Sequence, residues 1–286
     1  MKKAFLLCLI IITLLLGYSV VFAEPEIIDI ANNKTITFSE MINDLQGITY
    51  IFLGDDITVK EHQVAQSEII DSIYKKNNKL AIGLEVFRSS NQYVLDAWVF
   101  GGLEKRSFVD KFNSNWGDWN RYSKIFQYAR DKKIQLAALN VSRDILIQVE
   151  MQGFDSLSES QLGSLGEGIV CDLVPSYTDV MRRMHLYKGT FKRLSFENYC
   201  EMQILGDIMM AKNLKEFNKE HHDLTVIVIA GETHSWKHGV PERIGTDSKI
   251  QSKTILFEGR INRNNATSAE ADYLWLNSGD TGWREN

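Results

Sequence analysis

Short apolar runs alternate with longer segments of helical spacing along most of this chain. The apolar runs are rich in β-branched residues and nearly continuous, and they lie at residues 48–53, 80–84, 134–139, 224–230 and 254–257. A strand that is covered on both faces has this pattern, because neither side of it meets water. These five runs are therefore predicted to be buried strands.

Amphipathic helices are predicted between the runs. Residues 59–75 place Val64, Ile69, Ile70 and Ile73 on one side, and residues 119–132 do the same with a second apolar set. Strands that alternate with helices of this length form a mostly parallel sheet with helices on both faces. The predicted fold class is therefore α/β.

The alternation stops after Ile145, and residues 148–217 contain no convincing strand. A short helix is predicted within 153–168, and longer helices over 173–187 and 196–217. We expect a helical subdomain at 148–217, inserted between two parts of an α/β body at 24–147 and 218–286. Residues 272–276 are predicted to add a final edge strand or to dock on the body.

The N-terminus has the pattern of a secretory signal peptide. Lys2 and Lys3 precede an apolar run from Ala4 to Leu16, and small residues lead to Ala23. The run is short for a membrane span, which needs about 20 residues. We expect residues 1–23 to be removed, leaving a soluble protein in the periplasm or cell envelope.

Charge and cysteine content narrow the function classes. Loss of Lys2 and Lys3 takes the formal net charge from −5 to −7, and no basic block remains, which argues against nucleic-acid binding. Outside the cytoplasm Cys171 and Cys200 are free to form a disulfide or to remain buried thiols, and the sequence leaves both open.

Polar residues follow four of the predicted strands. Asp55, Glu85, Asn140 and His234 come at or just after strand ends, and His62 begins the next helix after the first of these strands. Any one of them alone is typical of a cap or turn residue. Ligands collect beyond the carboxyl ends of parallel strands, so the four together predict one cleft.

Two carboxylates and a histidine suit acid–base chemistry or a divalent metal. If the protein is a metal-dependent hydrolase, His234, Glu85 and His62 are its candidate site residues. The chain has no His-Glu-x-x-His helix, which is the usual sign of a zinc hydrolase.

The predicted helix at 173–187 has its own cluster. Tyr177, Met181 and Met184 share one face, with His185 close by and Arg182 at its flank. Methionine and aromatic side chains pack against a porphyrin, cations meet its propionates, and Tyr, His or Met can ligate iron. From spacing alone, an ordinary buried helix face with surface arginines is the favoured alternative.

Blocks along nearly the whole mature chain resemble the ChaN-like family of haem-binding iron-uptake proteins. The resemblance rests on the order and spacing of these blocks: residues 50–54, His62, Gln66, 83–87, 95–97, 115–116, 138–140 with Arg143, 196–199, Gln203, Asp207, 210–211, 230–231, His234, 239–241 and 272–275.

The resemblance implies an α/β body with a helical subdomain, haem bound near that subdomain, and iron held by a tyrosine, for which Tyr177 is the candidate. It also implies a homodimer around two stacked haems. A phenolate is a hard anionic donor that favours ferric iron, and the metal must lower its pKa from about 10.

The chain departs from relatives of the TIKI and TraB type, some of which are metal-dependent proteases with two Gly-x-x-His motifs. The second motif is kept as Gly231–His234, but the first reads Gly54-Asp55-Asp56-Ile57, and isoleucine cannot bind a metal. A lipid-attachment cysteine of the kind found in lipoprotein relatives is also missing, which leaves membrane association open.

We therefore expect an exported, non-catalytic protein that holds ferric haem for iron acquisition or trafficking, with an outer-membrane haem receptor as a further partner. The haem-contacting candidates are Tyr177 as the metal ligand, Met181, Met184, His185, Arg182, His234, His62 and Glu85. The alternatives are a metal-dependent hydrolase and a partner-binding module without enzymatic activity.

Overall fold

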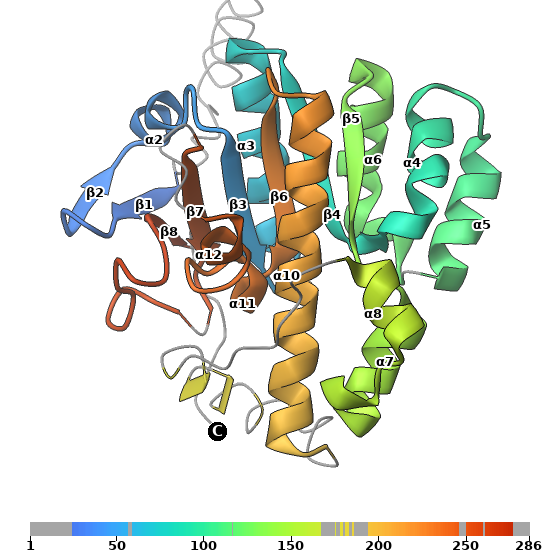
Figure 1. Cartoon of the computed structure of the whole chain (residues 1–286). Helices are drawn as coiled ribbons and strands as arrows, with labels where there is room; N and C mark the ends of the chain where they lie inside the picture. The colour runs from blue at the N-terminus through green and yellow to red at the C-terminus, as the bar shows by residue number, and fades with distance from the viewer. Residues whose placement is uncertain are drawn as a thin grey trace, which may run out of the picture.

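The computed structural model describes residues 25–56, 59–115, 117–166, 175, 178–179, 181–182, 185, 194–245, 250–259 and 261–276. Its centre is an eight-stranded sheet in the order β2-β1-β8-β7-β3-β6-β4-β5 (Figure 1). The strands are β1 (Glu26–Asp29), β2 (Lys34–Ile36), β3 (Tyr50–Asp55), β4 (Leu80–Arg88), β5 (Gln135–Asn140), β6 (Thr225–Gly231), β7 (Ser252–Phe257) and β8 (Tyr273–Leu276). The segments 1–23 and most of 167–193 lie outside the described residues.

The six strands from β8 to β5 run parallel to one another, β1 pairs antiparallel with β8, and β2 pairs antiparallel with β1 at the edge of the sheet. The predicted α/β class with a mostly parallel sheet is confirmed. All five predicted strands are present. The segment 272–276 does form a strand, but β8 pairs on both sides, with β7 and β1, so it is internal and not an edge strand.

Helices cover both faces of the sheet, as the alternating pattern predicts. One face carries α2 (Phe38–Asp44), α3 (Lys60–Lys76), α4 (Gln92–Val99), α5 (Lys105–Asn115) and α6 (Trp119–Lys132). The other face carries α10 (Phe196–Glu220) and the short α11 (Glu232–Ser235) and α12 (Val240–Ile244). Alternate residues of one strand serve the two sides: Ile51 and Leu53 join the first core, whereas Tyr50 and Phe52 join the second.

The first core is dominated by aromatic rings. Phe87, Trp98, Phe108, Phe112 and Phe126 are almost completely buried and pack with neighbouring ring centroids 4.3–6.4 Å apart. Edge-to-face and offset contacts of this kind stabilise a core beyond the area they bury. This packing fixes β4 against α4, α5 and α6.

The helix α10 belongs to two layers at once. Its second half buries Met210, Ala211 and Leu214 on the sheet face. Its first half extends past the carboxyl ends of the strands, where α7 (Arg143–Gln152) and α8 (Glu159–Leu165) also lie (Figure 1). There Leu205 and Met209 form a separate apolar cluster with the two shorter helices, joined by the 3-10 helix η2 (Phe154–Ser156).

Within the described part of the chain, no helix combines the length and the hydropathy that a bilayer crossing requires. α10 is 25 residues long, but charged and amide side chains interrupt its apolar face.

Candidate functional site

The carboxyl ends of β3, β4 and β6 come together at one edge of the sheet. β3 ends at Asp55, whose Cα pairs with Gly231 at the end of β6. The helix α11 begins directly after Gly231 and carries His234. Glu85 lies near the end of β4, which pairs with the other side of β6. This is the edge at which the sequence predicted a cleft.

His234 lies between two carboxylates. Its Nδ1 is 2.6 Å from Oδ1 of Asp207, which comes from α10, and its Nε2 is 3.6 Å from Oε1 of Glu85. The Asp207 side chain is completely buried, and the His234 side chain is 12% exposed. A carboxylate can only accept, so Nδ1 carries the proton in this bond. The pair therefore holds the imidazole in one orientation and turns its Nε2 edge towards Glu85.

An irregularity in β4 positions Glu85. The pairing of β4 with β5 shifts register between Leu84 and Arg88, and a bulge of this kind redirects side chains. Oε2 of Glu85 then accepts a hydrogen bond of 2.6 Å from the backbone N–H of Gly231. A Cβ atom at Gly231 would lie 3.5 Å from that same oxygen, which is an ordinary contact, so the hydrogen bond and not the lack of a side chain at Gly231 positions Glu85.

Asp55 is a second carboxyl group at this edge, in a different environment. It is 7% exposed, and its Oδ2 accepts a 2.8 Å hydrogen bond from Nε2 of Gln66 on α3. Burial raises the pKa of Asp55 to about 7, against the lowering effect of Gln66, and the charge of Glu85 adds to the rise. The phenol of Tyr122 on α6 is close enough to feel both carboxylates, and burial is the main cause of its raised pKa.

The structure does not add His62 or Asn140 to this group. The His62 ring is buried: its Nδ1 accepts from the Asp56 backbone N–H at 3.1 Å, and its Nε2 lies 3.2 Å from the Glu258 carbonyl. It also stacks on Phe257. Burial lowers the pKa of His62, so the neutral ring ties the end of β3 to the end of β7. Asn140 accepts from the backbone N–H of Val141 at 2.9 Å and shapes a turn.

Three candidates of the predicted helix at 173–187 are described. Met181 is completely buried and packs in a cluster with Tyr199 and Ile204 of α10. The Arg182 guanidinium lies 4.3 Å from the centroid of the Phe196 ring. His185 places Nε2 3.3 Å from the carbonyl of Leu194. Tyr177 and Met184 lie outside the described residues.

Cys200 is a buried free thiol beside this cluster, and burial raises its pKa to about 12. Cys171 lies outside the described residues, so the structure does not test a disulfide between the two. No three His, Cys, Asp or Glu side chains among the described residues are arranged so as to hold a metal ion.

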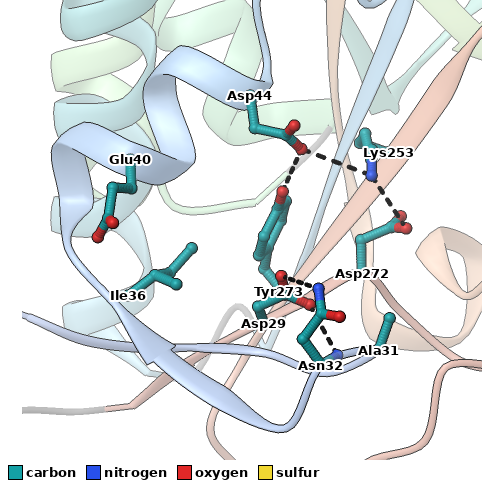
Figure 2. Close-up of a pocket in the computed structure, with 9 residues that line it drawn as sticks. All are labelled: Asp29, Ala31, Asn32, Ile36, Glu40, Asp44, Lys253, Asp272 and Tyr273. Carbon is teal, nitrogen blue, oxygen red and sulfur yellow. Dashed lines mark hydrogen bonds and ion pairs between the residues drawn. The ribbon is translucent and has the colours of Figure 1, made fainter.

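A separate cavity of about 290 Å³ lies at the opposite end of β7, between the β1–β2 hairpin and α2 (Figure 2). Four of its nine lining residues are acidic, and Lys253 reaches towards both Asp44 and Asp272 inside it. None of the predicted site residues lines this cavity. Each of its acidic side chains has a partner within the protein: Asp44 and Asp272 pair with Lys253, Asp29 accepts from Asn32, and Glu40 accepts from Thr37.

The sequence reading did not assign roles to three members of the carboxyl-edge group. The sequence does hint at a role for Asp207, because this charged residue lies on the apolar face of a helix, between Leu205 and Met210. Gln66 and Tyr122 gave no such signal, because a glutamine or tyrosine on a buried helix face is common. Their roles appear only when α3 and α6 are placed beside the strand ends.

Comparison with known proteins gives three results. The model of a family described as haem-binding uptake, Tiki superfamily, ChaN, matches residues 41–244. A solved structure of cofacial haem binding to ChaN of Campylobacter jejuni superposes with a TM-score of 0.65 and 21% identity, covering 90% of this chain and 98% of that one. The fold is therefore shared along nearly the full length of both chains.

The third result is a plant protein, RETICULATA-RELATED 5, chloroplastic, of Arabidopsis thaliana. It is 21% identical over 280 residues, which are 90% of this chain and 37% of the plant protein. This chain thus spans little more than a third of that relative.

Proposed function

We propose that this chain, which belongs to the haem-binding uptake family of the Tiki superfamily that includes ChaN, binds ferric haem outside the cytoplasm and passes on its iron or the intact porphyrin without catalysing a reaction. The observation that carries the proposal is the family match over residues 41–244, which includes the sheet edge, α10 and the segment that leads into it.

Tyr177 is the proposed iron ligand. The other donor side chains described on this segment and at the start of α10 fit this choice by their chemistry. The Cys200 thiol, with its pKa raised to about 12 by burial, stays protonated and is a poor ligand, and Nε2 of His185 is within bonding distance of the Leu194 carbonyl. A phenolate is the donor that suits ferric iron, which when bound would supply the positive charge that lowers the phenol pKa.

Apolar and cationic groups around the start of α10 suit the rest of a porphyrin. Phe196 and Met202 are only partly buried there, and Arg182 adds a positive charge beside Phe196. Polarisable thioethers and aromatic rings pack against a flat apolar ligand, while a guanidinium pairs with its carboxylates. Met184, outside the described residues, is proposed as a further contact.

We also propose export and pairing. Residues 1–23 would direct the chain out of the cytoplasm and be removed after Ala23. Two copies would then enclose two haems face to face; cofacial haem binding is described for ChaN of Campylobacter jejuni. An outer-membrane haem receptor is the proposed further partner.

Titration of the mature protein with hemin tests the proposal. We expect saturable binding at micromolar protein, a largely high-spin ferric spectrum, and elution as a dimer in size-exclusion chromatography with hemin present. Tyr177→Phe should change the spectrum and weaken binding at least about tenfold, since it removes a charged ligand.

The matched control is Tyr93→Phe, because Tyr93 is 63% exposed on α4 and far along the chain from the proposed ligand. It should behave as the wild type. Absence of saturable hemin binding by the wild-type protein would reject haem as the ligand. An unchanged spectrum in Tyr177→Phe would reject only the choice of that tyrosine.

One observation favours hydrolysis as a second candidate function. The buried Asp207 orients His234 so that its Nε2 edge faces Glu85, and an oriented imidazole is suited to general-base work. His62 is not free to join a metal, because both of its nitrogens are occupied. If the chain hydrolyses esters or peptides with or without added Zn, Mn or Co, His234→Gln should abolish that activity; inactivity of the wild type would remove this candidate.

A further inference from the structure

Two arginines lie at or just after the carboxyl ends of the neighbouring strands β4 and β5. Beyond its bulge, β4 continues to Arg88, whose Cα pairs with Asn140 at the end of β5. From Asn140 the chain turns within three residues into α7, which begins at Arg143. Neighbouring strands are about 4.8 Å apart, so the two arginines start from adjoining backbone.

Neither guanidinium has a hydrogen bond or ion pair to any residue in the described ranges. The chain has 37 acidic residues against 32 Lys and Arg, so carboxylate partners are plentiful in general. Arg88 is nevertheless half-buried, and Arg143 is exposed beside it.

The electrostatics of Arg88 agrees with this placement of the two cations. Burial lowers the pKa of Arg88, the positive charge of Arg143 lowers it further, and Asp144 opposes both effects. Two like charges close together repel, and partial burial strengthens that repulsion by reducing the screening of water. An unpaired cationic couple is therefore unfavourable by itself and becomes favourable when an anion lies between its members.

The start of α7 adds to the same positive field. Ser142 occupies the N-cap position of this ten-residue helix, but its side chain makes no capping hydrogen bond. The first backbone N–H groups of the helix therefore receive no hydrogen bond from this side chain, and the helix dipole favours a negative charge there, to which the exposed Asp144 of the first turn contributes one.

We propose that Arg88 and Arg143, supported by the first turn of α7, bind an oxyanion of the carboxylate or phosphate type. The inference rests on the adjoining positions of the two arginines, on the half-buried side chain of Arg88 and on the lack of a hydrogen bond or ion pair from either guanidinium to a described residue, and the helix terminus strengthens it. The oxyanion comes either from a porphyrin propionate or from a free anion such as phosphate. Only the first source rests on the proposed haem function.

The first experiment uses inorganic phosphate as the probe, at constant ionic strength set with NaCl. We expect phosphate to raise the thermal midpoint of the full mature protein, and the double variant Arg88→Gln, Arg143→Gln to bind phosphate at least about tenfold more weakly. Arg106→Gln, an exposed arginine on α5, is the matched control and should respond as the wild type does. Equal stabilisation of all three proteins would overturn the proposal.

The second experiment identifies the source by comparing hemin with hemin dimethyl ester, in which the propionates are neutral. If the propionates occupy the site, the wild type prefers hemin about tenfold, and the double variant loses that preference while keeping the iron spectrum. If wild type and double variant bind both compounds alike but phosphate binding depends on the arginines, the ligand is a free anion. Failure to bind either porphyrin, with phosphate binding intact, would reject the haem function and retain the oxyanion site.

Discussion

The buried Asp55 carboxyl shows how one residue can couple the sheet edge to pH. Its pKa of about 7 in the folded protein compares with about 4 in an unfolded chain, and burial is the main cause. Between these two values the unfolded chain has released the proton while the folded protein still holds it. Folding is therefore favoured below about pH 4 and is progressively disfavoured as the pH rises to 7.

We predict that Asp55→Asn removes this pH dependence. The amide keeps an oxygen for Gln66 but cannot ionise. The difference in unfolding free energy between the variant and the wild type should therefore be about 2.5 kcal/mol larger, in favour of the variant, at pH 8 than at pH 5. Urea unfolding at several pH values measures it. Asp110→Asn, at an exposed position on α5, should show no such growth; a constant difference for Asp55→Asn would mean that the carboxyl is ionised in the fold.

At the scale of elements, two glycines near the strand ends differ in how closely their neighbours pack against them. A Cβ atom at Gly54 in β3 would lie 2.6 Å from Cδ2 of Leu256 and 2.8 Å from Cβ of Ser235 in α11. A Cβ atom at Gly206 in α10 would meet only Cε1 of His234, at the ordinary distance of 3.5 Å. The first glycine is required by packing, and the second is not.

The two alanine variants should therefore change stability in opposite directions. Gly54→Ala forces α11 or β7 to move and should lower the unfolding free energy by about 1–3 kcal/mol. Gly206→Ala replaces a helix-interior glycine without a clash and should raise it by about 0.5–1 kcal/mol. The urea midpoints of the two variants compare their stabilities, provided that the denaturant dependence of the unfolding free energy is the same. An unchanged midpoint for Gly54→Ala would show that α11 has room to shift.

Apolar runs predicted the central strands correctly, because a strand buried on both faces is apolar at nearly every position and stands out from the amphipathic helices around it. The hairpin β1–β2 was missed because its strands have only four and three residues and mix charges with isoleucines. That omission also explains the error over β8, which is internal only because the hairpin covers its outer side. Asp55, Glu85 and His234 were placed correctly at one edge by topology alone, whereas His62 has bonds that only three-dimensional packing reveals.

On the scale of the whole molecule, the two ends of the described chain are paired. Ile27 of β1 stands opposite Trp275 of β8, and Ile27 is completely buried in the main core. The N-terminal hairpin is thus part of the central sheet, and we expect it to unfold together with the rest.

Ile27→Ala tests this cooperativity. Loss of a buried isoleucine side chain should lower the global unfolding free energy by about 2–5 kcal/mol, read from the urea midpoint. Thr35→Ala, on the exposed strand β2, should change it by no more than about 0.5 kcal/mol. If Ile27→Ala leaves the global midpoint unchanged while proteolysis near the N-terminus speeds up, the hairpin opens independently.

The pairing of β1 with β8 also fixes the order of events when the protein is made. Among the strands of the sheet β1 is translated first and β8 last, so β1 must wait for all the other strands before its partner β8 exists. Closing so long a loop is entropically costly and slow. Completion of the sheet is therefore a late step that follows synthesis of the last strand, so the nascent chain stays without its full sheet until β8 has been made.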